Sequence, residues 1–396
     1  MGATDSGGLV IRNGNVLLSS GDTRACDVLI ESGTITKLGT GLRAGSEIDA
    51  TGGWVLPGLI DLHTHGICYE SASAGTLEDY SRIEAARGAT TFYPTLFAPP
   101  DEIAAQMIRH RRETNELQLA PQVVGFRLES PYLAFASGGL PKDTAPISTY
   151  TTEMLLEAGG GHIKLWDVSP ELPSAPELIG RLSGLGMVCS MAHTFATIEQ
   201  ARAAVDAGAR LVTHMFDTFE IPQETEPGAY PAGLVDYLLV EDRVTCEIIG
   251  DGTHVHPLLV EKAFRCKSAE RIAFVTDSNL GAGLPPGRYE LPVGWGLAEV
   301  KGRNDGVRLV DRGMELCGSA LTPIDSFRNA VRLFGKDIAT ASRVCSTTPA
   351  RLLGLNKGEI APGRDADLIV LDRKLDLIHT IVGGVSIYSR QPGGSA

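Results

Sequence analysis

The chain has 396 residues, of which 43% are hydrophobic and 21% charged, a composition typical of globular proteins and not of disordered or fibrous ones. Its formal net charge of −13 disfavours nucleic acid as a partner, because phosphate backbones are bound by basic surfaces. No apolar run approaches the ~18 residues of a membrane span, and the first residues lack the apolar stretch of a secretory signal. The seven cysteines are scattered without a CxxC pair, as expected of reduced thiols, so we expect a cytoplasmic protein without a membrane partner.

Both ends of the chain are rich in short β-type runs. Near the N-terminus these runs are separated by Asn13-Gly14, Ser32-Gly33 and Gly52-Gly53, which are typical of hairpin turns. The C-terminal stretch has the same character, for example in DADLIVLD and LIHTIVGGVSIY. Because chain termini often lie close in space, we expect residues 1–55 and 357–396 to form one small β-sandwich domain.

Residues 56–356 alternate apolar runs with segments that are apolar at every third to fourth position. This alternation predicts βαβ units and a parallel sheet. Eight apolar runs fit a closed barrel, so the expected fold is α/β: a (β/α)8 TIM-like barrel beside the terminal β-sandwich domain. The eight runs are GLIDLHTHG, TTFYPTL, VVGFRLESPYL, HIKLWDV, MVCSMAHT, LVTHMFD, VTCEIIGDGTHV and RIAFVTDS.

Polar residues gather where these runs end. In a barrel the carboxyl ends of the strands meet at one mouth, which is where active sites lie. Burying so many titratable groups is costly unless a metal ion or a partner compensates them. The residues in question are His63, His65, Glu129, His193, His214, His254 and Asp277.

His63 and His65 lie on the same side of a strand, because side chains alternate with a period of two, so both imidazoles can reach one cation. Zinc suits a mixture of imidazole and carboxylate ligands, and iron, manganese and cobalt share these preferences. A dication lowers the pKa of bound water and polarises a carbonyl, and a neighbouring carboxylate can carry the proton. Asp277, at the end of the last run, suits this role, and Glu129 can bridge two ions.

The motifs PGLIDLHTHG, LESPYL, AHT, THMFD, DGTHV and VTDS occur in an order that resembles the amidohydrolase superfamily. More narrowly, the chain is similar to the N-acetylglucosamine-6-phosphate deacetylases, and the likeness extends to GEIAPGRDADLIVLD near the C-terminus. The resemblance implies a cytoplasmic homodimer of amino-sugar metabolism. It also implies metal-dependent removal of the acetyl group from an N-acetyl amino sugar or its 6-phosphate, with one or two ions per chain.

The resemblance also assigns roles to individual residues. It implies that Glu129, His193 and His214 bind one metal ion, with His63 and His65 at the second site. Asp277 matches the catalytic carboxylate, which shuttles the proton and also binds metal. Residues that match substrate-contacting positions are His254, Asp217, Thr218 and Cys317.

Three positions leave alternatives open. His256, two residues after His254, is the other candidate for the inward-facing imidazole. Lys164 is an alternative bridge between metal ions in its carboxylated form, disfavoured because Glu129 already supplies an anionic ligand. Cys317 has a packing role as an alternative to contact with substrate.

The sequence departs from the deacetylases where they bind phosphate. Thr225 stands where they have an Arg, and Asp217-Thr218 replaces an Asn-Ala pair. Lys142 and Arg288 are the candidate substitutes for the missing cation. Negative charge disfavours a phosphate dianion, so we expect unphosphorylated or cationic N-acyl substrates to be hydrolysed at least as well as the 6-phosphate. The nearby carboxylates are Asp217, Glu220, Glu224 and Glu226.

Three other functions remain to be distinguished from this one. The same barrel can carry a deaminase or a cyclic-amide hydrolase, and release of ammonia instead of acetate would identify the former. A deacetylase of a non-sugar N-acyl amine is the second alternative. The third is a non-catalytic protein that acts through assembly, against which the intact set of potential metal ligands argues.

Overall fold

The computed structural model describes residues 7–116, 120–136, 144–219, 226–229 and 231–391. At its centre eight parallel strands form one sheet in the order β15-β14-β13-β12-β11-β10-β9-β6. Thr64, the last residue of β6, pairs in parallel with Ser278, which lies three residues beyond β15, and the Asp277 N–H donates to the His63 carbonyl over 2.9 Å. These contacts join the last strand to the first and close the sheet into the expected barrel.

Each barrel strand falls within one of the eight predicted apolar runs. The runs are long and apolar because both faces of a barrel strand are covered, one by the barrel interior and one by helices. The strands are β6 (Leu59–Thr64), β9 (Ala89–Leu96), β10 (Phe126–Leu128), β11 (Ile163–Val168), β12 (Val188–Met191), β13 (Leu211–Val212), β14 (Thr245–Ile249) and β15 (Ile272–Val275).

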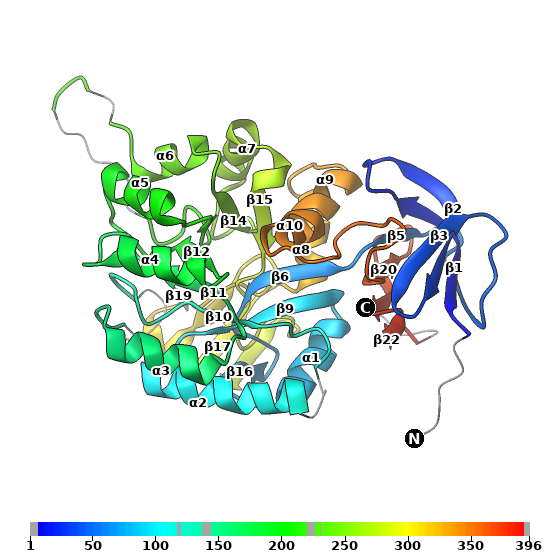
Figure 1. The fold of residues 1–396 in the computed structure, drawn as a ribbon, viewed down its shortest axis with the longest axis horizontal. Coiled ribbons are helices and arrows are strands. Elements are labelled where there is room, and N and C mark those ends of the chain that lie inside the picture. The colour runs from blue at the N-terminus through cyan, green and yellow to red at the C-terminus, as the bar shows by residue number, and fades with distance from the viewer. Residues whose placement is uncertain (1–6, 117–119, 137–143, 220–225, 230, 392–396) are drawn as a thin grey trace.

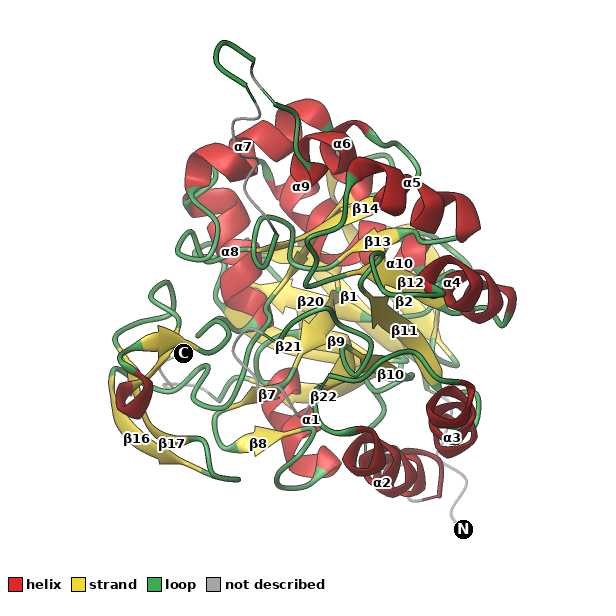
Figure 2. Ribbon diagram, turned by 90° about the vertical axis from the view of Figure 1, so that its left-hand side faces the viewer, coloured by secondary structure: helices red, strands yellow, loops and turns green. Residues whose placement is uncertain are grey.

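A helix follows each strand and packs on the outside of the barrel, as Figure 2 shows. The fifth helix is typical: a capping box between Thr197 and Gln200 begins it, and Ala201, Ala204 and Val205 form its buried face. The helices are α1 (Leu77–Ala85), α2 (Pro100–Arg111), α3 (Thr149–Gly159), α4 (Ala175–Gly184), α5 (Ile198–Ala207), α6 (Leu234–Val240), α7 (Pro257–Cys266), α8 (Pro323–Arg332), α9 (Ile338–Ser342) and α10 (Thr348–Leu352).

A second sheet lies beside the barrel and combines strands from both ends of the chain (Figure 1). Its order is β22-β21-β20-β5-β1-β2-β3, with β4 paired to β1, so both predicted terminal stretches contribute to it. The boundaries 1–55 and 357–396 stay a prediction. Its strands are β1 (Leu9–Leu17), β2 (Thr23–Glu31), β3 (Thr34–Gly39), β4 (Ser46–Asp49), β5 (Trp54–Pro57), β20 (Leu368–Leu371), β21 (Leu377–Val382) and β22 (Val385–Ser389).

The prediction of a hairpin turn at Asn13-Gly14 was wrong. Both residues lie inside β1, where the register with β2 shifts between Ile11 and Gly14 and Asn13 has a φ of 60°. The Asn13 N–H donates to the Asp27 carboxylate over 3.1 Å, which supports the irregular backbone. The pair therefore forms a β-bulge, for which a residue with positive φ is as well suited as for a turn.

A small antiparallel sheet is inserted after the last barrel strand, and the sequence did not predict it. Its strands are short and mix exposed, half-buried and buried residues, so they lack the continuous apolar runs that marked the barrel. Figure 2 shows β16 and β17 apart from the ring of helices. The strands are β16 (Gly287–Leu291), β17 (Gly296–Val300), β18 (Val307–Leu309) and β19 (Glu315–Leu316), and a separate pair is β7 (Gly66–Ile67) with β8 (Glu70–Ser71).

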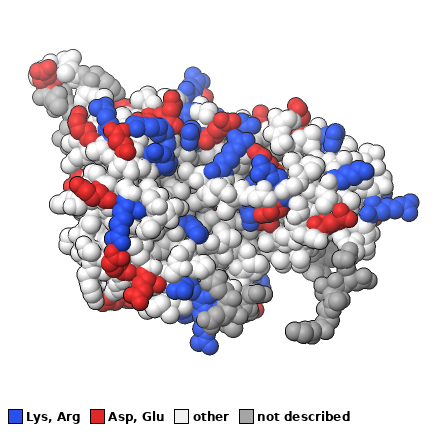
Figure 3. Space-filling model, in the orientation of Figure 1, with Lys and Arg blue, Asp and Glu red and all other residues white. Residues whose placement is uncertain are grey.

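Acidic and basic side chains are interspersed over the face drawn in Figure 3. On that face they form no continuous basic stripe of the kind that tracks a phosphate backbone. Among the residues described, no helix is both long and apolar enough to cross a bilayer.

Candidate metal and substrate site

The predicted metal ligands all lie at the carboxyl ends of barrel strands. His63 is in β6, Glu129 directly follows β10, and the remaining ligands come one or two residues after their strands. Three of them have positive φ: 44° at His193, 25° at His214 and 46° at Asp277. The backbone thus leaves the extended conformation just where these side chains enter the mouth, and such strain is typical of functional sites.

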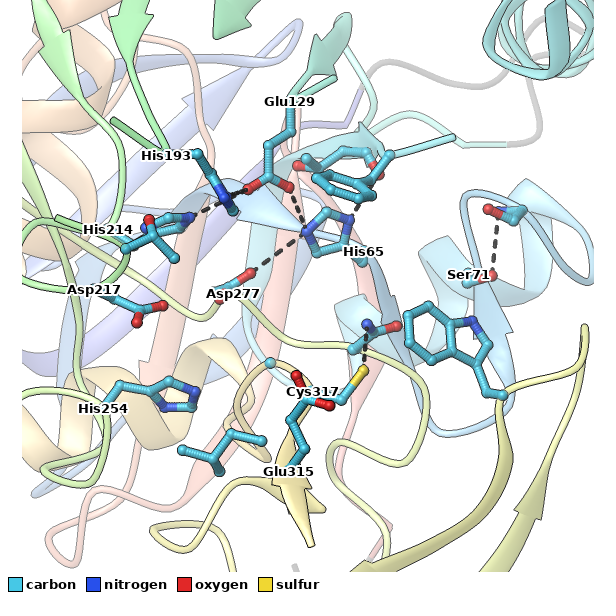
Figure 4. A pocket seen from close by; sticks show the side chains of 18 residues that line it. His65, Ser71, Glu129, His193, His214, Asp217, His254, Asp277, Glu315 and Cys317 are labelled. Atoms are coloured by element: carbon cyan, nitrogen blue, oxygen red, sulfur yellow. Dashed lines mark hydrogen bonds and ion pairs between the residues drawn. The ribbon is translucent and has the colours of Figure 1, made fainter. Parts of the chain in front are cut away.

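The Glu129 carboxylate lies between two pairs of histidines, of which Figure 4 shows His65, His193 and His214. Its Oε2 is 2.9 Å from Nε2 of His65 and 3.4 Å from Nε2 of His63. Its Oε1 is 3.0 Å from Nε2 of His193 and 3.2 Å from Nε2 of His214. One carboxylate oxygen therefore serves each pair, which is the arrangement of a group that bridges two cations.

Asp277 lies on the other side of the first histidine pair. Its Oδ1 is 3.4 Å from Nε2 of His63 and 3.5 Å from Nε2 of His65. Burial alone raises the pKa of this carboxyl, but the charges of His63, His65 and His214 outweigh burial and lower it to about 2. Asp277 is therefore ionised at neutral pH and can accept a proton.

The donor atoms fit a divalent cation. Three of them, from His63, His65 and Asp277, converge at 3.2–3.5 Å from one another. A tetrahedral zinc site with bonds of 2.0–2.1 Å has ligands about 3.3 Å apart. His63, Glu129 and His214 form a second group of converging donors. Without an ion, burial opposes protonation of His65, but Glu129 and Asp277 raise its pKa to about 10, so the site attracts positive charge.

A layer of paired charges lies deeper in the barrel and was missed from the sequence. Arg127, two residues before Glu129 on β10, is completely buried. Its guanidinium donates to Oδ2 of Asp167 over 3.0 Å, to Oε1 of Glu247 over 2.5 Å and to the Leu62 carbonyl over 3.1 Å. The only signal in the sequence was the presence of Arg127, Asp167 and Glu247 inside three of the apolar runs.

This deeper layer contacts the ligands above it. Oε2 of Glu247 lies 3.6 Å from Nδ1 of His63, the ring nitrogen opposite the metal-facing Nε2, and accepts the His214 N–H over 3.4 Å. Burial raises the pKa of Glu247, but Arg127 and His63 outweigh burial and lower it to about 2. An ionised carboxylate behind a ligating histidine orients the ring and strengthens its binding to metal.

His254 faces the cavity, and His256 does not. The His254 side chain is 5% exposed, and its Nδ1 lies 2.6 Å from Oδ2 of Asp251. This contact leaves Nε2 toward the cavity, where Figure 4 shows the ring. His256 instead accepts the Leu258 N–H as the N-cap of α7. Asp251 was not singled out from the sequence.

A cavity of about 230 Å³ opens at the metal ligands. All four predicted substrate-contacting residues, His254, Asp217, Thr218 and Cys317, line it. Cys317 accepts a hydrogen bond from Asn279 over 3.4 Å and is buried, which raises the pKa of its thiol to about 12, so it is a neutral wall residue. Lining residues that the sequence analysis missed include Ser71, Thr95, Phe97, Asn279, Trp295, Glu315 and Leu316.

Three further candidates lie away from the cavity or outside the described residues. Lys164 donates to the Gly161 carbonyl over 3.0 Å and lines a different cavity, between α3 and α4, so it bridges no metal ions here. Arg288 is paired with Glu299 over 2.7 Å and is absent from the lining of the substrate cavity. The candidates outside the described residues are Lys142, Glu220, Glu224 and Thr225.

Comparison with known proteins identifies the family to which the chain belongs. The model of the Amidohydrolase family matches residues 54–387. The chain is 29% identical over 389 residues to the N-acetylglucosamine-6-phosphate deacetylase of Lysinibacillus sphaericus, covering 95% of this chain and 97% of that protein. It is 31% identical over 327 residues to the N-acetylgalactosamine-6-phosphate deacetylase of Escherichia coli O157:H7, covering 81% and 84%.

Solved structures give the same result. A mutant N-acetyl-D-glucosamine-6-phosphate deacetylase from Mycobacterium smegmatis, in complex with N-acetyl-D-glucosamine-6-phosphate, matches with a TM-score of 0.85 at 27% identity, covering 96% of this chain and 100% of that chain. N-acetylglucosamine-6-phosphate deacetylase from Thermotoga maritima matches with a TM-score of 0.83 at 25% identity and the same coverage. The predicted fold class is confirmed, and so is the resemblance to these deacetylases.

Proposed function

Because the chain belongs to the amidohydrolase family, we propose that it is a metal-dependent hydrolase that removes the acetyl group from an N-acetyl amino sugar. The observation that carries this proposal is the Glu129 carboxylate, with one oxygen on each of two histidine pairs at the mouth of the barrel. Similarity to deacetylases of N-acetylglucosamine 6-phosphate and N-acetylgalactosamine 6-phosphate over most of the chain supports the acetylated amino sugar as the substrate class.

We assign one ion to His63, His65, Glu129 and Asp277, and a second to Glu129, His193 and His214. The nitrogen and oxygen donors favour zinc, with iron, manganese or cobalt as the alternatives. When bound, such ions lower the pKa of a water molecule and withdraw electron density from a carbonyl group.

Two residues of the chain, Asp277 and His254, then act on the reacting atoms. Asp277 accepts a proton from the attacking water and returns it to the nitrogen of the departing amine. The water oxygen forms a bond to the acyl carbon, the C–N bond breaks, and acetate and the free amine are the products. Burial opposes protonation of His254, but Asp251 raises its pKa, and in the protonated form Nε2 donates to the acyl oxygen as negative charge develops there.

The proposal also includes a cytoplasmic location and assembly as a homodimer. All seven cysteines are free, which suits a reducing compartment.

Acetate release tests the reaction class. Protein loaded with Zn²⁺ should release one acetate for each amine formed from N-acetyl hexosamines, with no ammonia. Enzyme treated with a chelator should lose this activity and regain it when Zn²⁺ is restored. Release of ammonia without acetate would show that the barrel carries a deaminase, and no release of either by metal-loaded protein would contradict a hydrolytic function on these substrates.

A further inference from the structure

The substrate cavity is acidic beyond what metal binding requires. Among the described lining residues there is no Lys or Arg, whereas four carboxylates line the cavity. Glu129 and Asp277 belong to the metal-ligand cluster described above. Asp217 and Glu315 remain as carboxylates with no part in that cluster.

Asp217 lies on the loop that follows β13, three residues after His214, and its N–H donates to the His214 carbonyl over 3.0 Å. Figure 4 shows its carboxylate between the side chains of His214 and His254, directed into the cavity. Within the described part of the chain, this carboxylate has no hydrogen-bond or ion-pair partner. A carboxylate held in this way at a cavity wall is available to a ligand.

Glu315 reaches the cavity from the inserted sheet, where it begins β19. It is exposed, and within the described residues its carboxylate also lacks an ion-pair partner. Trp295, from the turn between β16 and β17, lines the same cavity. An indole face attracts cations through its negative quadrupole, so it adds to the attraction of the carboxylates.

One cation approaches this wall. The guanidinium of Arg312 lies over the Trp295 ring, 5.9 Å from its centroid. Arg312 is not among the residues that line the cavity. The position of Arg312 shows that the Trp295 indole accepts a cation. The part of Arg312 in substrate recognition can be tested separately.

We propose that this cavity selects an N-acetyl amino sugar, or a closely related N-acetyl amine, that carries a second, protonated amine, and that Asp217 and Glu315 are its specificity-determining residues. The inference rests on the proposed function. An ammonium group forms a charge-assisted hydrogen bond with either carboxylate, whereas a phosphate dianion is repelled by both. The described lining residues therefore favour an ammonium group over a phosphate.

Three matched compounds test the proposal: N-acetylglucosamine and its analogues with phosphate or with an amino group in place of the 6-hydroxyl. Acetate release by the Zn²⁺-loaded enzyme gives kcat/KM for each. We expect the 6-amino compound to exceed N-acetylglucosamine by roughly tenfold, the size of one charge-assisted hydrogen bond, and to exceed the 6-phosphate by more. Raising the salt concentration should reduce the advantage of the 6-amino compound, because salt screens exposed charges.

Substitutions test whether Asp217 and Glu315 cause the preference for the 6-amino compound. Asp217→Asn and Glu315→Gln should each lower the ratio of kcat/KM for the 6-amino compound to kcat/KM for N-acetylglucosamine by about three- to tenfold. Glu290→Gln is the matched control, because Glu290 is an exposed carboxylate of the same inserted sheet that does not line the cavity. Calorimetric titration of the Asp277→Asn protein with the 6-amino compound gives a dissociation constant that is independent of turnover.

The outcomes separate this inference from the proposed function. If the 6-phosphate is the best substrate, and Asp217→Asn and Glu315→Gln leave all three values unchanged, the inference is overturned and deacetylation stands. Loss of a 6-phosphate preference in Arg312→Gln would then identify the cation that binds phosphate. If metal-loaded enzyme releases acetate from none of the three compounds, both the inference and the proposed amino-sugar substrate are wrong.

Discussion

The barrel holds two groups of buried charges at different depths, and they are held in different ways. Toward the mouth, Glu129 and Asp277 face imidazole nitrogens, and the backbone at His193, His214 and Asp277 is strained. Deeper in the barrel, Arg127 is paired with Asp167 and Glu247, and all three lie within regular strands.

The difference shows how buried charge serves two purposes in one fold. The deeper charges compensate one another, so their burial requires no ion from outside the protein. The histidines and carboxylates at the mouth converge on a common point, and an external cation is the natural partner of such a group. We therefore expect substitutions in the deeper group to reduce stability, and substitutions at the mouth to reduce metal binding and turnover.

The largest effect on stability should come from Arg127→Met. Removing the guanidinium leaves Asp167 and Glu247 buried without their counter-charge, so the free energy of unfolding should fall by about 3–5 kcal/mol. Denaturant unfolding measures this change. Arg243→Met is the control, because Arg243 forms ion pairs while its side chain remains 45% exposed, and its loss should lower the free energy of unfolding far less. Equal effects of the two substitutions would contradict the distinction between the layers.

At the mouth, replacing both His63 and His65 by Asn should remove one of two metal ions. Elemental analysis of Zn²⁺-reconstituted protein should give two ions per chain for the parent and one for the double variant. The second ion should remain because His193, His214 and Glu129 are intact. A stoichiometry of one ion in both proteins would show that the first pair does not bind metal.

Asp277→Asn should lower kcat by about 10²-fold or more, because the amide cannot accept the proton of water. The Michaelis constant should change little. Since Asp277 also faces the first metal site, the ion content of the variant has to be measured beside its steady-state kinetics. A variant that binds both ions and retains most of its turnover would exclude Asp277 from the proton transfer.

The smallest effect should come from Glu247→Gln, which keeps the shape of the side chain behind His63 but removes its charge. We expect the affinity for Zn²⁺ to fall by about tenfold, as measured by competition with a chelator. Glu84→Gln is the control: both oxygens of Glu84 are buried without a hydrogen-bond partner, and burial raises the pKa of its carboxyl well above the usual value. Unchanged affinity in Glu247→Gln would restrict the deeper layer to a purely structural role.

The sequence predicts the barrel well because its strands are covered on both faces. Such strands appear as apolar runs, and the polar residues that end six of the eight runs are easily recognised, as with His63 and Glu129. The same reasoning misses Arg127, because one charged residue within a short apolar run can equally face solvent. Its partners come from strands 40 and 120 residues away, and only the closed barrel brings them together.

Other parts of the site could not be predicted for a different reason. The inserted sheet that supplies Trp295 and Glu315 has short, half-exposed strands, so no periodic pattern marks it. Asn13-Gly14 shows a related ambiguity, because a residue with positive φ suits both a hairpin turn and a β-bulge. In both cases the local sequence is compatible with several backbone conformations, and tertiary contacts select one of them.

The pairing of β5 with β20 has a consequence for the order of events during synthesis. β5 ends at Pro57 and β20 begins at Leu368, 311 residues later. At a usual rate of 5–20 residues per second, the ribosome needs roughly 15 to 60 s to make the intervening chain. During this time the edge of β5 that pairs with β20 remains unpaired, while the barrel strands are synthesised in order. The sheet that contains β5 is therefore completed after the barrel strands, so the nascent protein carries an open strand edge until β20 has been made.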